Sequence, residues 1–232
     1  NRIIVFGGAN RSMTSEYIER VLDTAQPDDW VLLQNEVNLV PEIICRAHEK
    51  GLRVVFNPSP VPENTEKLPL ACVSLFMVNE IEAAQLAGTD ANADFEDTLT
   101  ALRAKYPNAS VVMTVGADGV LYDGEEGRFQ LPAFKVKAVD TTAAGDTFCG
   151  YFLAAVSAGK SVQTALQEAS AASASLSRAQ ARLPRCRQQM KYGNFCAGTH
   201  KSSETGQTES PKGVYRYAHY NRTRRLYFLR SV

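Results

Sequence analysis

Short apolar runs alternate with stretches of helical periodicity along most of the chain. The apolar runs predict strands at residues 2–6, 30–34, 52–57, 73–79 and 110–115. Apolar positions three and four residues apart predict helices at 15–25, 40–50, from Glu80 onward, and at 94–105, 144–159 and 161–177. We expect Ser15 to cap the first of these helices. Residues 119–139 are typical of a hairpin with its turn at Asp123-Gly124.

This order of elements predicts an α/β fold. Nearly continuous apolar strands that alternate with amphipathic helices indicate a doubly wound, mainly parallel sheet with helices on both faces. Ligands of such sheets bind at the carboxyl ends of the strands. Polar residues directly after predicted strands are therefore the first candidates for a site: Gln34–Glu36, Asn57, Asn79–Glu82, Thr114–Gly119 and Asp140–Asp146.

The distribution of charge divides the chain near residue 178. Residues 1–178 contain 14 Lys and Arg against 23 Asp and Glu, a net charge of −9, whereas residues 179–232 contain 11 against 2, a net charge of +9. We therefore predict one domain over 1–178 and a basic, irregular tail over 179–232. The arginines and tyrosines of the tail suit nucleic acids, but a merely solvated tail is the simpler explanation, so we expect no nucleic-acid partner.

Hydropathy and cysteine content predict where in the cell the protein is located. The chain has no run of about 18 apolar residues, so we expect no membrane span. Its five cysteines have no paired spacing, which predicts reduced thiols in a cytoplasmic protein. Cys186, Cys196 and His200 also lack the spacing of zinc ligands.

The segment DTTAAGD, residues 140–146, is a candidate for phosphate chemistry. Its small residues let the backbone approach a ligand closely. If a helix begins here, the free N–H groups of Ala143, Ala144, Gly145 and Asp146 and the helix dipole form an anion site. Asp146 then either accepts a proton from an attacking hydroxyl or is a carboxylate that matches the helix dipole.

Five stretches, in this order, resemble the ribokinase-like (PfkB) family of carbohydrate kinases, and within it the ribokinase branch. They are LLQNE (32–36), FNPSP (56–60), VNEIEAAQLAG (78–88), TVGADGV (114–120) and DTTAAGDTF (140–148). The resemblance covers about residues 1–178. It implies a ribokinase-like fold and ATP-dependent phosphorylation of a primary hydroxyl of a sugar, with ribose as the first candidate.

The resemblance also implies roles for individual residues. Asp146 corresponds to the catalytic base and contacts the sugar, and the amides of Ala143 to Asp146 correspond to the anion hole. The other correspondences are Glu36 for a sugar hydroxyl, Asn79 and Glu82 for the phosphates and the Mg²⁺ shell, Thr114, Gly116 and Gly119 for ATP, and Asp140 and Thr142 for a monovalent cation, K⁺. Without the resemblance, each has a plain structural explanation as a turn former, a surface acid or a hairpin glycine.

The two ends depart from the family pattern. We expect this chain to lack the family's first strand, its Gly-Gly-Lys-Gly-x-Asn sugar motif and the lid that mediates homodimers in full-length members. Residues after Arg178 depart from the family's ending, as a reading-frame change near residue 179 would produce. We therefore expect weak or no turnover. The alternatives are a kinase for another sugar or a nucleoside, a nucleotide-binding relic, and a nucleic-acid binder that acts through the tail.

Overall fold

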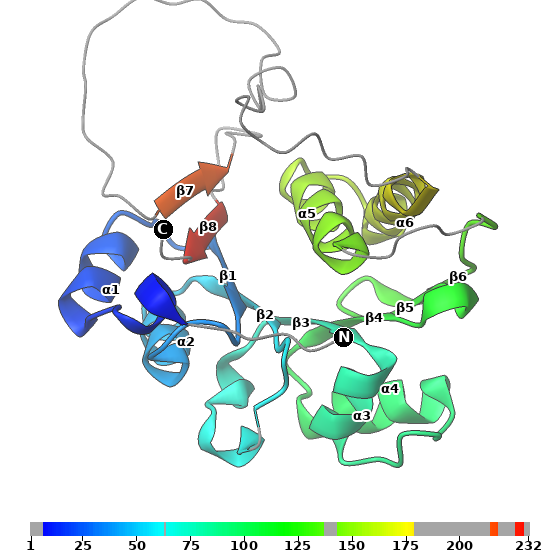
Figure 1. The fold of residues 1–232 in the computed structure, drawn as a ribbon, viewed down its shortest axis with the longest axis horizontal. Helices are drawn as coiled ribbons and strands as arrows, with labels where there is room; N and C mark the ends of the chain where they lie inside the picture. The colour runs from blue at the N-terminus through cyan, green and yellow to red at the C-terminus, as the bar shows by residue number, and fades with distance from the viewer. Residues whose placement is uncertain (1–6, 63, 137–142, 179–213, 218–225, 230–232) are drawn as a thin grey trace, which may run out of the picture.

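The computed structural model describes residues 7–62, 64–136, 143–178, 214–217 and 226–229 (Figure 1). Its α-helices are α1 (Ser15–Leu22), α2 (Val40–Glu49), α3 (Glu80–Ala87), α4 (Phe95–Lys105), α5 (Ala144–Ser157) and α6 (Val162–Arg178). Its strands are β1 (Trp30–Gln34), β2 (Arg53–Asn57), β3 (Leu75–Asn79), β4 (Ser110–Thr114), β5 (Val120–Gly124), β6 (Gly127–Leu131), β7 (Val214–Tyr217) and β8 (Leu226–Leu229). Short 3₁₀ helices are η1 (Gly8–Arg11), η2 (Thr65–Lys67), η3 (Leu70–Cys72) and η4 (Gly116–Asp118).

The strands form one mixed sheet in the order β6-β5-β4-β3-β2-β1-β8-β7. The pairs from β1 to β4 are parallel, as is the pair of β1 with β8, and the remaining pairs are antiparallel. The carboxyl ends of β1 to β4 therefore meet at one edge of the sheet, as the sequence analysis expected.

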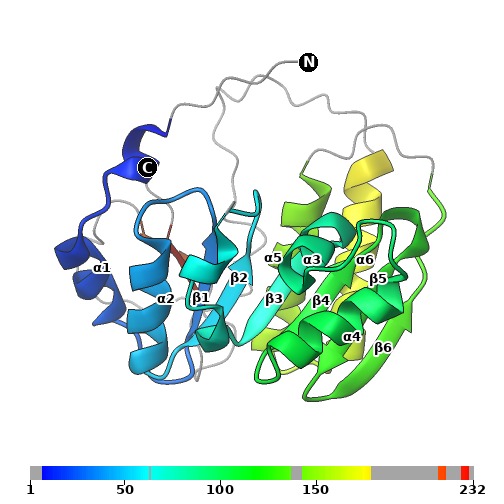
Figure 2. The ribbon, with the colours of Figure 1, turned by 90° about the horizontal axis from the view of Figure 1, so that it is seen from below.

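Helices cover both faces of this sheet (Figures 1 and 2). On one face, helices α1 to α4 pack on alternate strand residues such as Val31, Leu33 and Phe76. On the other face, α5 and α6 pack on the residues in between, such as Leu32 and Met77. Because both faces are buried, the strands are apolar at nearly every position. The predicted doubly wound α/β fold is confirmed.

Two local predictions are wrong. Thr14, not Ser15, caps α1, because its side chain accepts a hydrogen bond from the Tyr17 amide at 3.2 Å. Ser15 instead donates a hydrogen bond to Glu42, 3.0 Å away on α2.

The hairpin also turns two residues later than predicted. Gly124 pairs with Gly127, so the two-residue loop is residues 125–126 and β6 ends at Leu131. Asp123 stays within β5, where its carboxylate lies 3.2 Å from Arg103 Nε and 3.8 Å from Arg128 Nε.

The tail contains two strands that the sequence analysis did not predict. β8 pairs in parallel with β1, with Trp30 opposite Leu226, and β7 pairs with β8. The expectation of an irregular tail is wrong for these eight positions. Their sequences, VYRY and LYFL, consist mostly of residues that favour strands, but each run is only four residues long in a segment of polar and basic composition.

Some predictions lie outside the described residues, among them the strand at 2–6 and the cluster of Cys186, Cys196 and His200. In the part of the chain that the structure describes, no helix has the length and apolar character needed to cross a membrane.

Candidate active site

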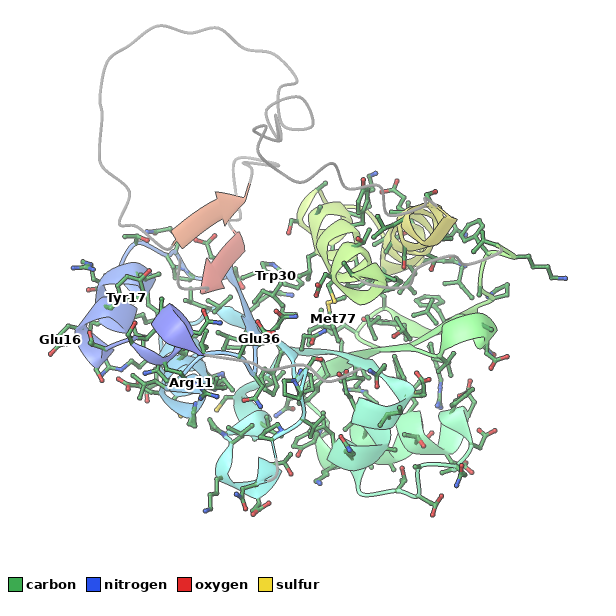
Figure 3. The ribbon with its side chains drawn as sticks, viewed as in Figure 1. Arg11, Glu16, Tyr17, Trp30, Glu36 and Met77 are labelled. Atoms are coloured by element: carbon green, nitrogen blue, oxygen red, sulfur yellow. The ribbon has the colours of Figure 1, made fainter. Side chains whose placement is uncertain are left out.

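A hollow lies at the carboxyl ends of β1 to β4, beside the first turn of α5. It encloses about 490 Å³, its open mouth included. The lining residues are Gln34, Asn57, Ser59, Met77, Val78, Asn79, Glu82, Val112, Thr114, Gly145, Asp146, Phe148 and Cys149. Figure 3 shows Met77, which belongs to the apolar cluster between the sheet and α5.

Strand register places the polar groups of the hollow in two pairs. Gln34 at the end of β1 lies opposite Asn57 at the end of β2. Asn79 at the end of β3 lies opposite Thr114 at the end of β4. Each of the four strands ends at its polar residue. The apolar residues before it are buried, whereas the polar residue at the strand end is only partly buried.

The first turn of α5 offers backbone N–H groups to this hollow. Ala143 precedes the helix in the left-handed conformation (φ 61°) and provides no capping side chain. The first intrahelical bond runs from the Thr147 amide to the Ala143 carbonyl, so the amides of the residues in between have no acceptor within the helix. Apart from the helix's own backbone, a Cβ built at Gly145 would meet no atom of the described residues within 4 Å, which leaves space for a ligand close to the backbone. The arrangement suits an anion.

Asp146 is the acid of this turn. Its side chain is exposed and lines the hollow, and its Oδ1 accepts a hydrogen bond from Gln34 Nε2 at 3.3 Å. The position of the carboxylate in the first helical turn is compatible with both interpretations of Asp146. It can stabilise the helix through the helix dipole, and it can act as a base beside an anion site.

Asn79 and Glu82 form a capping box at the start of α3. Asn79 Oδ1 accepts a hydrogen bond from the Glu82 amide at 2.8 Å, and Glu82 Oε2 accepts one from the Asn79 amide at 3.0 Å. This box gives both residues a structural role. The box engages one side-chain oxygen of each residue, so among the described residues the Asn79 side-chain NH₂ and the second Glu82 oxygen remain for a ligand in the hollow.

Thr114 Oγ1 donates a hydrogen bond to the Val78 carbonyl at 3.3 Å. The side chain thus links the ends of β3 and β4 beneath Asn79. Thr114 is also part of the lining of the hollow.

Asn57 and Cys149 meet on the wall of the hollow. Asn57 Nδ2 donates to Cys149 Sγ at 3.6 Å, whereas the buried Asn57 Oδ1 finds no hydrogen-bond partner among the described residues. Burial raises the pKa of the Cys149 thiol to about 12, against a smaller lowering by the Asn57 hydrogen bond. The thiol therefore keeps its proton at neutral pH.

Three expected residues lie outside the lining of the hollow. Glu36 is exposed on the segment after β1 (Figure 3). Gly116 lies in η4 and Gly119 directly after it, both with positive φ. A side chain at Gly119 would lie 2.0 Å from the Leu131 carbonyl oxygen, so packing against the end of β6 alone requires glycine there. Asp140 and Thr142 lie outside the described residues.

The acidic groups of the hollow are few. Glu82 and Asp146 line it, and the described residues contain no cluster of three or more His, Cys, Asp or Glu that would hold a metal ion alone. Such a set fits Mg²⁺, which keeps several waters and is held largely by substrate phosphates.

Gln34, Ser59 and Cys149 line the hollow without an assigned role in the sequence analysis. The rule that ligands bind at strand ends marked Gln34 and Asn57 as candidates. No sequence signal pairs them with residues more than 90 positions later, because those contacts arise from the packing of α5 on the sheet.

Comparison with known proteins agrees with this geometry. The family described as pfkB family carbohydrate kinase matches residues 3–185. The ribokinase of Bacillus subtilis (strain 168) is 35% identical over 180 residues, which cover 76% of this chain and 58% of the relative. The chain thus spans little more than half the length of this curated relative.

Solved structures give the same picture. Ribokinase from Thermotoga maritima superposes with a TM-score of 0.62 at 31% identity, over 77% of this chain and 59% of that one. Ribokinase from Arabidopsis thaliana, complexed with ribose and ATP, superposes with a TM-score of 0.64 at 26% identity, over the same shares.

Proposed function

Because this chain belongs to the pfkB family of carbohydrate kinases, we propose that its hollow transfers the γ-phosphoryl group of ATP to a primary hydroxyl of a sugar of the ribose class. One observation supports this above the others. The uncapped first turn of α5 shares a hollow with Asp146, Asn79 and Glu82.

In this proposal, the residues divide the work of phosphoryl transfer. Asp146 takes the proton of the attacking hydroxyl, and the amides of Ala144, Gly145 and Asp146 bind the charge on the transferred group. Asn79 and Glu82 orient the phosphates, Glu82 would hold Mg²⁺ through its waters, and Thr114 contacts the nucleotide. The ion, when bound, neutralises charge on the ATP phosphates.

Other assignments rest on the family resemblance alone. They are Gly116 and Gly119 beside ATP, Glu36 on a sugar hydroxyl, and Asp140 with Thr142 around K⁺. Glu36 is exposed and does not line the hollow, so its role rests on the resemblance.

The test is transfer of labelled phosphate from ATP to ribose, deoxyribose or fructose, with Mg·ADP affinity measured by calorimetry on the same sample. Asp146→Asn should lower transfer by about 10²–10⁴-fold and leave Mg·ADP affinity within about twofold. Gln130→Glu, an exposed change on β6, serves as the control. Transfer that Asp146→Asn does not reduce would overturn the assignment of the base.

A second function is favoured by the lining of the hollow. Because Asn79, Glu82 and Thr114 line it and Glu36 does not, nucleotide binding without transfer is the alternative. Mg·ADP affinity that falls on Asn79→Ala, with no labelled sugar from any of the three acceptors, would favour that alternative. A chain that binds no nucleotide contradicts both functions.

A further inference from the structure

The first turn of α5 is joined to the sheet by two side-chain amides from neighbouring strands. Gln34 and Asn57 are directly opposite each other in the register of β1 and β2. Gln34 donates to Asp146 Oδ1 at 3.3 Å, and Asn57 donates to Cys149 Sγ at 3.6 Å. The two acceptors are three residues apart, so they lie on one face of the helix.

We propose that Gln34 and Asn57 are positioning residues that hold the first turn of α5, and with it the Asp146 carboxylate, in its place over the strand ends. This inference rests on the proposed function for its catalytic consequence, but not for its structural part. We call the two contacts, Gln34–Asp146 and Asn57–Cys149, the amide clamp.

The Gln34 contact fixes the carboxylate itself. A hydrogen bond to an ionised group is stronger than one between neutral groups, and this one engages Oδ1. Oδ2 remains for the hydroxyl of a substrate. The carboxylate is exposed and makes no other hydrogen bond among the described residues, so loss of the Gln34 donor leaves its rotation free.

The Asn57 contact acts one turn further along the helix, inside the protein. Cys149 is 9% exposed and packs in the apolar cluster with Phe152 and Leu153. Its thiol stays protonated, since burial raises its pKa to about 12. If the Asn57 amide turns over, the thiol can donate to Oδ1 instead, so the pair is held in either orientation.

A third contact joins the same turn to α6. Ser173 Oγ donates to the Ala144 carbonyl at 3.0 Å. The turn is therefore held from the sheet at Asp146 and Cys149 and from α6 at Ala144, while its amide side faces the open hollow. Sub-ångström placement of a catalytic group is what such contacts provide.

Cys149 itself supplies a reporter that needs no turnover. Its alkylation by iodoacetamide, followed by mass spectrometry of the cysteine-containing peptides, measures how often the first turn of α5 opens. Cys45 on α2 and Cys72 in η3 lie on the opposite face of the sheet and serve as internal references.

The variants are Gln34→Met, which keeps the length of the side chain and removes the donor, and Asn57→Leu. Gln130→Met, exposed on β6, is the matched control. We expect Cys149 to react roughly fivefold to tenfold faster in either clamp variant, with Cys45 and Cys72 unchanged.

Three outcomes would overturn the proposal. They are an unchanged rate at Cys149, an equal acceleration at all three cysteines with a lower Tm, and an acceleration in Gln130→Met as well. In a chain that transfers phosphate, Gln34→Met should lower kcat about tenfold and change KM for ATP less than twofold. In a chain that does not transfer phosphate, the alkylation rate of Cys149 still tests the amide clamp. A failure of the clamp can therefore be distinguished from a failure of the proposed function.

Discussion

The position of Asp146 in the first turn of α5 is compatible with two roles, stabilisation of the helix and the proposed transfer of a proton. A carboxylate in the first turn stabilises the helix through its dipole, and the same place puts it at the mouth of the hollow. Asp146→Asn should therefore lower the free energy of unfolding by only a few tenths of a kcal/mol to about 1 kcal/mol. The same change should greatly lower the rate of the proposed phosphoryl transfer.

Because of Cys149, we expect the free energy of unfolding to fall as pH rises above 9. Burial raises its pKa from 9.0 to about 12, so the native thiol keeps its proton where the unfolded thiol loses it. The contribution of the Cys149 thiol to the free energy of unfolding is complete below pH 9. It is lost as pH rises from 9 to about 12, by at most about 1.4 kcal/mol per pH unit.

Urea titrations at pH 8 and pH 10.5 check this prediction. The free energy of unfolding should fall more in wild type than in Cys149→Ser, which does not titrate and keeps an acceptor for Asn57. Tyr17 and Tyr106, whose pKa values burial also raises, act equally in both proteins. Parallel losses in the two would contradict the prediction.

At the scale of elements, α3 shows how one motif serves structure and site together. The capping box of Asn79 and Glu82 begins the helix, and the same residues line the hollow. Helix α4 has a comparable cap, because Asp94 accepts from the Glu96 amide at 2.8 Å, but Asp94 is not part of the hollow.

This comparison separates capping from binding. Asn79→Ala and Asp94→Ala should each lower the free energy of unfolding by about 1 kcal/mol. Only Asn79→Ala should also weaken Mg·ADP, which calorimetry measures. Equal affinities in the two variants would leave Asn79 as a cap alone.

The loop between β4 and β5 offers a second matched pair. In Gly119→Ala the new Cβ would meet the backbone of Leu131 and Ala133 at 2.0 and 2.7 Å, at φ 108°, so we expect a loss of about 3 kcal/mol. Gly116→Ala, at φ 54° with no atom of the other described residues within 4 Å of the new Cβ apart from its chain neighbours, should lower the free energy of unfolding by about 1 kcal/mol. Thermal unfolding measures both, and the reverse order would refute the packing explanation for Gly119.

At the scale of the whole molecule, the tail and the domain meet at the edge of the sheet. β8 covers the edge of β1 through parallel backbone pairing. A chain that ends at residue 178 should expose the backbone groups of this edge and self-associate more strongly. Sedimentation of the shortened and full chains over a range of concentrations tests this, and equal association in both would contradict it.

Hydrophobic periodicity predicted most of the fold, because helices cover both faces of the sheet and strands such as β1 and β3 are therefore apolar at nearly every position. Helices α5 and α6 begin and end within two residues of their predicted bounds. The cap of α1 was wrong because Thr14 and Ser15 are chemically alike, and only tertiary packing gives Ser15 another partner, Glu42.

The site was predicted in part, for a related reason. Asp146, Asn79, Glu82 and Thr114 follow strands or begin helices, so local sequence places them together in the hollow. The contacts of Gln34 and Asn57 with α5 join residues 112 and 92 positions apart. Such pairs depend on how the helix packs on the sheet, which a single sequence does not encode locally.

The missing cap at Ala143 has a consequence for how the protein is handled and how long it lasts in a cell. Because no side chain of the described residues caps the first amides of α5, an anion that binds these amides stabilises the native protein by mass action. Phosphate or sulfate in a purification buffer would then stabilise the folded protein. The proposed nucleotide would act in the same way and should slow proteolysis of the chain.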